Sequence, residues 1–170
     1  MNHWLFKSEP DVFGIDHLAA KPKATEHWDG VRNYQARNFM RQMQVGDQAF
    51  FYHSNCDPPG IVGIVEVVRE AYPDHSAWNP DSKYFDPAST PDNPRWFMVD
   101  VRLVRKLPRL ISLTELRDNP ALIEMPLLRR GNRLSVMPVA ADAWQAILEM
   151  AESPDASAAL GRTASPTATP

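Results

Sequence analysis

The sequence lacks most of the features that mark metal-binding and catalytic proteins. Its 170 residues contain a single cysteine, Cys56, so no disulfide can form within the chain and no zinc site can rest on several thiolates. The five histidines show no paired ligand spacing. A phosphate-cradling glycine loop, a serine nucleophile elbow and a recognisable carboxylate pair are also absent. We therefore expect no metal, no cofactor and no catalytic activity.

Long apolar runs are missing too. No stretch approaches the roughly 20 apolar residues needed to span a bilayer, so no membrane partner is expected. The first residues, MNHWLFKSEP, have no apolar run behind a basic start and do not resemble a signal peptide. These features indicate a cytoplasmic protein, with nucleoid association an open alternative in a bacterium and nuclear localisation in a eukaryote. A monomer is the expected state.

An excess of basic charge is lacking as well. The formal net charge is -3, which argues against a protein that coats nucleic acid through bulk charge. The charges are nevertheless segregated, because residues 32–46 hold three arginines and no acid, whereas residues 47–94 hold eight acids and two basic residues. Residues 95–134 are basic again, with nine Lys/Arg and four acids. This pattern allows a basic face that could hold a few phosphates, with an uneven solvated surface as the alternative.

The chain divides into two parts of different composition. From Ser153 onward, 14 of 18 residues are Ala, Ser, Thr or Pro, and none is aromatic. Such a segment cannot bury enough apolar surface to offset its ordering entropy, so residues 153–170 are predicted to be a disordered tail. A single domain is predicted over residues 1–152, a length that suits one hydrophobic core.

Short strands and helices are predicted throughout this domain. Strands are predicted at HWLFK, QAFFYH, GIVGIVEVVREAY and RWFMVDVRLVRKL, and helices at DVFGIDHLAA, YQARNFMRQM, SLTELRDN and AADAWQAILEM. In the last strand, Val99 and Val101 are expected on one face and Met98 on the other. Residues 73–94, rich in proline and aspartate, indicate a lid, a binding loop or a disordered insertion. The pattern favours a mixed α+β domain built on a curled sheet or barrel.

The polar stretch HSNCDPPG, residues 53–60, separates two apolar strands. A thiol nucleophile needs a base within reach, and His53 lies three residues before Cys56. No third orienting residue is evident, and the two prolines suit a rigid turn as well as an active site. A pocket-rim loop is therefore preferred, and an enzyme that uses Cys56 and His53 on a nucleotide or small metabolite is the less favoured alternative.

Binding is better supported than catalysis. Trp28 stands near Gly30 and Asn33, and a large aromatic beside a glycine and an amide can form a slot for a flat base. The segment LLRRGNRLSV places three arginines around a Gly-Asn turn, which suits phosphate or sugar contact. A lone tryptophan is more often a core residue, so Trp28 and Trp96 could instead belong to the hydrophobic core.

Five blocks of the sequence resemble a known family. They are WLFKSEPDVF, HWDGVRNYQARN, FYHSNCDPPGIVGIVEVVREAYPD, NPRWFMVDV and LLRRGNRLSV, in this order between Trp4 and about Met150. They resemble the EVE domain family, a branch of the PUA-like superfold that is similar to YTH domains, which hold a methylated RNA base in an aromatic cage. The resemblance implies a curled β-barrel of five or six strands with flanking short helices. It also implies non-enzymatic recognition of a modified base, usually a modified cytosine in DNA.

The resemblance implies roles for individual residues. FKSEP corresponds to the first YTH strand, which places Lys7 and Ser8 in the pocket, and HWDGV corresponds to the first cage tryptophan, which makes Trp28 the main stacking wall. The implied base pocket consists of Lys7, Ser8, Trp28, Gly30, Val31, Asn33, Tyr52, Ser54, Asn55 and Trp96. The residues expected to contact the nucleic-acid backbone are Arg32, Arg37, Arg129, Arg130, Asn132 and Arg133.

We therefore predict a non-enzymatic domain that binds nucleic acid carrying a modified base, with DNA preferred to RNA and with few phosphate contacts. An RNA-binding module or RNA-modification reader is the alternative, because it would use the same fold and the same residues. The second and third cage aromatics of YTH domains have no clear counterpart in the sequence, which argues against N6-methyladenine as the ligand.

Overall fold

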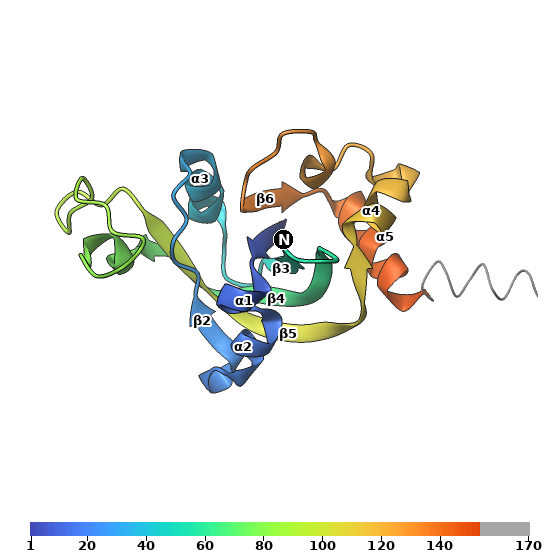
Figure 1. The fold of residues 1–170 in the computed structure, drawn as a ribbon, viewed down its shortest axis with the longest axis horizontal. Coiled ribbons are helices and arrows are strands. Elements are labelled where there is room, and N and C mark those ends of the chain that lie inside the picture. The colour runs from blue at the N-terminus through green and yellow to red at the C-terminus, as the bar shows by residue number, and fades with distance from the viewer. Residues whose placement is uncertain (154–170) are drawn as a thin grey trace, which may run out of the picture.

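A single six-stranded sheet organises the computed structural model, which describes residues 1–153 (Figure 1). Its strands are β1 (His3–Ser8), β2 (Thr25–His27), β3 (Gln48–His53), β4 (Gly60–Pro73), β5 (Phe97–Ser112) and β6 (Val136–Val139). They lie in the order β2-β5-β4-β3-β1-β6. The pair β1 and β3 is parallel and the other pairs are antiparallel, so the predicted mixed α+β class is confirmed. The predicted disordered tail lies outside the described residues, apart from Ser153.

Short helices cover the sheet. They are α1 (Pro10–Phe13), α2 (Ile15–Ala20), α3 (Tyr34–Gln42), α4 (Leu113–Asp118) and α5 (Ala141–Glu152), with 3-10 turns η1 (Pro22–Ala24), η2 (His75–Trp78), η3 (Pro120–Leu122) and η4 (Pro126–Leu128). The side chain of Asn33 caps α3 by accepting the Ala36 N–H, and Ser112 caps α4 by accepting the Glu115 N–H. The side chain of Glu115 does not complete a capping box here, because it forms an ion pair with Arg109.

The strands β1 and β3 are buried on both faces, which explains why their sequences carry little polar alternation. On one face, Phe6 and Phe51 pack in a cluster that includes Trp28. On the other, Phe50 packs in a second cluster and its ring stacks on Trp144 of α5 with centroids 3.9 Å apart. Side chains one residue apart therefore enter different cores.

Curvature of the sheet comes from its two longest strands, β4 and β5. Their pairing shifts register repeatedly, for example between Ile61 and Gly63 and between Arg69 and Tyr72, and such bulges bend and twist a strand. Val99 and Val101 are buried as predicted. Met98 was expected on the opposite face, and it too is buried in the same cluster.

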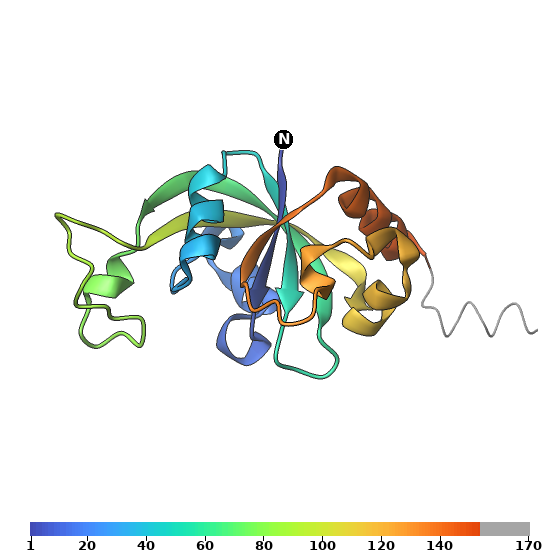
Figure 2. The same cartoon turned by 90° about the horizontal axis from the view of Figure 1, so that it is seen from above.

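Residues 74–96 form an ordered loop that protrudes beyond the end of β4 (Figures 1 and 2). The loop contains the η2 turn and an isolated bridge between Thr90 and Asn93, and it buries Asp74 and Ser89. Of the alternatives left by the sequence, a disordered insertion is therefore wrong. Within residues 1–153, no helix is both long enough and apolar enough to cross a membrane.

Candidate nucleic-acid interface

An open pocket of about 700 Å³ lies where several distant segments of the chain converge. The end of β1, the helix α1, the end of β2 with the turn after it, Ser54, the tip of the 74–96 loop and residues 133–135 before β6 all contribute to its wall. A volume of this size is typical of sites that enclose a small molecule or a single base.

Six of the predicted base-pocket residues line this cavity. They are Lys7, Ser8, Trp28, Gly30, Val31 and Ser54. Arg133, which was predicted to contact the nucleic-acid backbone, lines the pocket as well. The structure thus brings together residues that are separated by more than 120 positions in the sequence.

Four predicted pocket residues lie outside the lining. Asn33 is occupied as the cap of α3, and Asn55 is exposed in a turn where its φ is 51°. Tyr52 is only 3% exposed and belongs to the cluster on the opposite face of β3. Trp96 is buried, stacks on Tyr34 and donates its indole N–H to Asp86 at 2.7 Å.

Sequence reasoning missed several lining residues. Asp29 stood within the HWDGV block but received no role, and Tyr84 stands in the long segment that was only described as a lid or binding loop. The remaining missed residues are Glu9, Val12, Phe13, Glu26, His27, Lys83, Leu134 and Ser135. The unusual length of the 73–94 segment could have indicated that Lys83 and Tyr84 belong to a binding site, because long loops in compact domains are often functional.

Trp28 serves the core and the pocket at once. Its side chain is only 7% exposed, and its ring lies 4.8 Å from Phe6 and 5.5 Å from Phe51, centroid to centroid. The same residue lines the cavity. The two interpretations offered by the sequence, core residue and pocket wall, are therefore compatible, because the hydrophobic cluster holds the indole rigidly at the pocket surface.

A second aromatic, Tyr84, reaches the pocket from the 74–96 loop. It packs so closely over Gly30 that a Cβ at that position would overlap the tyrosine ring. Gly30 also adopts a φ of 80°, a conformation that favours glycine. The absence of a side chain at Gly30 therefore creates the space that Tyr84 occupies.

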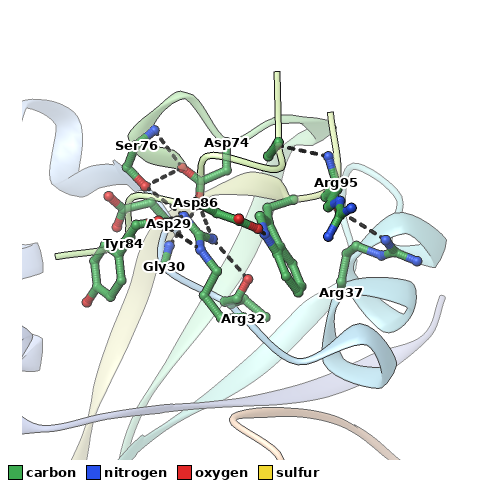
Figure 3. Close-up of polar contacts among 12 residues, drawn as sticks. Asp29, Gly30, Arg32, Arg37, Asp74, Ser76, Tyr84, Asp86 and Arg95 are labelled. Atoms are coloured by element: carbon green, nitrogen blue, oxygen red, sulfur yellow. Dashed lines mark hydrogen bonds and ion pairs between the residues drawn. The ribbon is translucent and has the colours of Figure 1, made fainter. Parts of the chain in front are cut away.

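Hydrogen bonds around Asp74 fix the position of this loop (Figure 3). The buried Asp74 carboxylate accepts the Gly30 N–H at 2.8 Å and pairs with the Arg32 guanidinium at 3.0 Å. Arg32 also donates to the backbone carbonyl of Tyr84 at 2.8 Å. Burial opposes ionisation of Asp74, but hydrogen bonds from Ser76, Gly30 and Arg32 hold the pKa of its carboxyl below the usual value.

Two charged side chains that line the pocket, Lys7 and Asp29, have few interaction partners. Lys7 has no hydrogen bond or ion pair from its Nζ within the described residues, and burial lowers the pKa of its ammonium. Burial, and then the charge of Asp74, raises the pKa of the Asp29 carboxyl. His27 lies nearby, with its Nε2 3.8 Å from Asp29 Oδ2. These groups are available to a polar ligand.

The predicted backbone-contacting residues divide into two kinds. Arg32 and Arg37 are engaged within the protein. Arg32 donates to the Tyr84 carbonyl of the 74–96 loop, and Arg37 donates to the carbonyl of Arg95 and to the side chain of Asn38. Asn132 holds a turn, since it donates to the Pro126 carbonyl and accepts the Leu134 N–H. The side chains of Arg129, Arg130 and Arg133 are exposed and remain candidates for phosphate contact.

Cys56 and His53 are not hydrogen-bonded to each other within residues 1–153. Burial, and then the charges of Asp11 and Asp57, raises the pKa of the Cys56 thiol, which favours the unreactive protonated form. His53 accepts the Ile15 N–H through Nε2 at 3.1 Å, and burial lowers the pKa of its imidazole. That nitrogen is therefore engaged in fixing α2. Within residues 1–153, no group of three or more His, Cys, Asp or Glu side chains is placed to hold a metal ion.

The curled mixed sheet and its flanking helices define a PUA-like domain, and an open pocket with polar and aromatic lining lies within it. The chain belongs to the EVE domain family, whose model matches residues 2–150. The family resemblance seen in the sequence is confirmed.

Characterised relatives and solved structures support this assignment. Human thymocyte nuclear protein 1 is 45% identical over 168 residues, which cover 89% of this chain and 74% of that protein. The crystal structure of the human THYN1 protein in complex with 5-methylcytosine containing DNA has a TM-score of 0.88 at 45% identity, with 91% of this chain and 100% of that chain covered. A crystal structure of a protein from Pseudomonas putida has a TM-score of 0.85 at 49% identity, with 88% and 99% covered.

Proposed function

We propose that this domain binds DNA that carries a modified cytosine and holds the modified base in the pocket beside Trp28. The observation that carries the proposal is the pocket itself, because it combines Trp28 and Tyr84 with a free cation and a hydrogen-bonding hydroxyl, Lys7 and Ser8. Aromatic faces stack on bases, and charged groups reach base edges. The related human protein solved with 5-methylcytosine DNA points to the same ligand class.

Capture of a base from a duplex requires that the base leave the stack. Unstacking and unpairing cost a few kcal/mol of free energy, and stacking on an aromatic side chain stabilises the bound base by about 1–3 kcal/mol. A hydrogen bond from Lys7 supplies the remainder, together with one accepted by the Ser8 hydroxyl, whose own proton is donated to the Phe13 carbonyl at 2.7 Å. Because the Trp28 ring is already fixed by Phe6 and Phe51, little ordering entropy is lost when the base enters. This is binding chemistry, and it requires neither Cys56 nor a cofactor.

The proposal is tested by binding of short single-stranded oligonucleotides that contain cytosine, 5-methylcytosine, 5-hydroxymethylcytosine or N6-methyladenine at one position. We expect the wild type to prefer a modified cytosine, and Lys7→Met to weaken that binding about tenfold by removing a charge-assisted hydrogen bond. Lys7→Met is preferred to Trp28→Ala because Trp28 also supports the core, whereas Lys7 is half-buried and the desolvation that lowers the pKa of its ammonium makes its charge unfavourable for folding.

Lys106→Met is the matched control. It removes the same charge from an exposed ion pair with Asp16, which contributes little to stability. Equal weak binding to all four oligonucleotides, with no effect of Lys7→Met, would contradict the proposal. RNA versions of the same oligonucleotides test the alternative of an RNA-modification reader. Cytoplasmic localisation and the monomeric state stay predictions.

A further inference from the structure

Asp29 is the half-buried carboxylate of the pocket that lacks a strong partner. Three acidic residues line the cavity. Glu9 is exposed, and Glu26 forms an ion pair with Lys21 at 2.9 Å and contacts His27. The contact between His27 and Asp29, at 3.8 Å, is too long for a hydrogen bond. Apart from a hydrogen bond with its own backbone N–H, the Asp29 carboxylate has no hydrogen-bond partner within the described residues, so acceptor positions remain open to a donor on a bound ligand.

The backbone on both sides of Asp29 is fixed. The Trp28 N–H donates to the Val99 carbonyl at 2.7 Å, and the Gly30 N–H donates to Asp74 at 2.8 Å. The Asp74 carboxylate already accepts hydrogen bonds from Gly30, Arg32 and Ser76, and it does not line the pocket. Figure 3 shows Asp29 next to Gly30, over which the Tyr84 ring packs. The carboxylate is thus presented to the pocket from a rigid segment.

We propose that Asp29 is a specificity-determining residue that accepts a hydrogen bond from the exocyclic amino group of the captured cytosine and thereby excludes thymine. This inference rests on the proposed function. An ionised carboxylate accepts hydrogen bonds and cannot donate them, and the position-4 substituent of cytosine is an amino donor. Thymine carries a carbonyl there, so two acceptors would face each other without a proton between them.

Lys7 complements Asp29 on the same base edge. Its ammonium group has three donors and no acceptor, which suits the ring nitrogen and carbonyl acceptors of cytosine. Thymine instead presents a donor at the ring nitrogen, which Lys7 cannot accept. One acidic and one basic side chain therefore match the donor and acceptor pattern of cytosine and mismatch that of thymine. The two bases share a 5-methyl group when the cytosine is 5-methylated, so the methyl group cannot separate them.

The test compares single-stranded oligonucleotides that carry 5-methylcytosine or thymine at one position and are otherwise identical. We expect the wild type to bind 5-methylcytosine about tenfold more tightly than thymine, as is typical of one well-formed base-edge contact. Asp29→Asn should reduce this ratio to about one, because an amide can either accept from an amino group or donate to a carbonyl. Burial and the Asp74 charge raise the pKa of Asp29, so loss of its charge does not destabilise the fold.

Asp118→Asn, an exposed carboxylate at the end of α4, is the control for a general change in net charge. It should alter both affinities equally and leave their ratio unchanged. An unchanged ratio in Asp29→Asn, or a wild type that does not distinguish the two bases, would overturn this inference. The proposed function would survive that result if the wild type still preferred modified over unmodified cytosine and lost the preference in Lys7→Met. The proposed function would fail if the wild type preferred neither modified over unmodified cytosine nor 5-methylcytosine over thymine.

Discussion

At the scale of single residues, the shape of the pocket depends on what Gly30 lacks. Its positive φ and the close approach of the Tyr84 ring both require the absence of a Cβ. Trp28 illustrates the converse, since a large side chain that fills the core also forms part of the pocket wall. One physical property of each of these residues therefore shapes both the fold and the pocket.

Gly30→Ala should separate the effect of backbone strain from that of the Tyr84 contact. We expect a loss of about 1–3 kcal/mol in the free energy of unfolding, together with weaker binding of the 5-methylcytosine oligonucleotide, because Tyr84 must move. Gly131→Ala is the control, since Gly131 has a φ of 79° but nothing within 4 Å of the added Cβ. Urea unfolding of both variants measures the difference. Equal losses in the two proteins would show that the Tyr84 contact is unimportant.

At the scale of elements, the 74–96 loop is held to the segment after β2 by the Asp74 and Arg32 pair. The loop is remote in sequence from every other wall of the pocket, yet it contributes Lys83 and Tyr84. In this pair the Asp74 side chain is fully buried and that of Arg32 is 22% exposed, and removal of Asp74 would leave the largely covered Arg32 charge without compensation. The order of this loop thus depends on a few polar contacts at its base.

Asp74→Asn should destabilise the protein by about 3 kcal/mol at pH 7, because Arg32 loses a charged partner. The pKa of Asp74 is depressed in the folded state, so its contribution is present above the unfolded pKa of about 3.9 and is lost as pH falls through the lower folded value. The difference between wild type and variant should therefore shrink below about pH 4. Thermal unfolding at several pH values tests this.

Asp92→Asn, which changes an exposed carboxylate in the same loop, provides the comparison. We expect it to unfold with nearly the wild-type free energy at neutral pH, since isolated surface charges contribute little. A cost for Asp74→Asn that stayed constant from pH 7 to pH 3 would show that the ionised carboxylate is not what stabilises the loop.

At the scale of the whole molecule, a net charge of -3 leaves little long-range attraction for DNA. Several arginines are also occupied by the protein itself, as Arg32 and Arg37 show. The exposed Arg129 and Arg130 stand close in sequence to Arg133 at the pocket. Affinity should therefore depend on the captured base and on a small number of phosphates.

Replacement of Arg129 and Arg130 by Gln should weaken binding to modified and unmodified oligonucleotides equally. We expect the slope of log affinity against log salt to fall in magnitude by about 1–2, since each phosphate contact contributes about 0.7–0.9. Fluorescence anisotropy titrations at several salt concentrations measure the slope. Arg105→Gln with Arg117→Gln removes the same charge from exposed positions outside the pocket lining. A selective loss for the modified oligonucleotide would contradict the assignment of Arg129 and Arg130 to phosphate contact.

The sequence by itself determined the local elements and the family. Apolar runs specify strands and polar caps such as Ser112 specify helix starts, because these signals act over a few neighbouring residues. Only the tertiary structure decided the membership of the pocket. Tyr52 lies one residue from Phe51 and therefore faces the opposite core, and Asn33 is consumed as a helix cap. Tyr84 and Gly30 became neighbours through the buried Asp74 anchor, a contact between distant segments that no local pattern encodes.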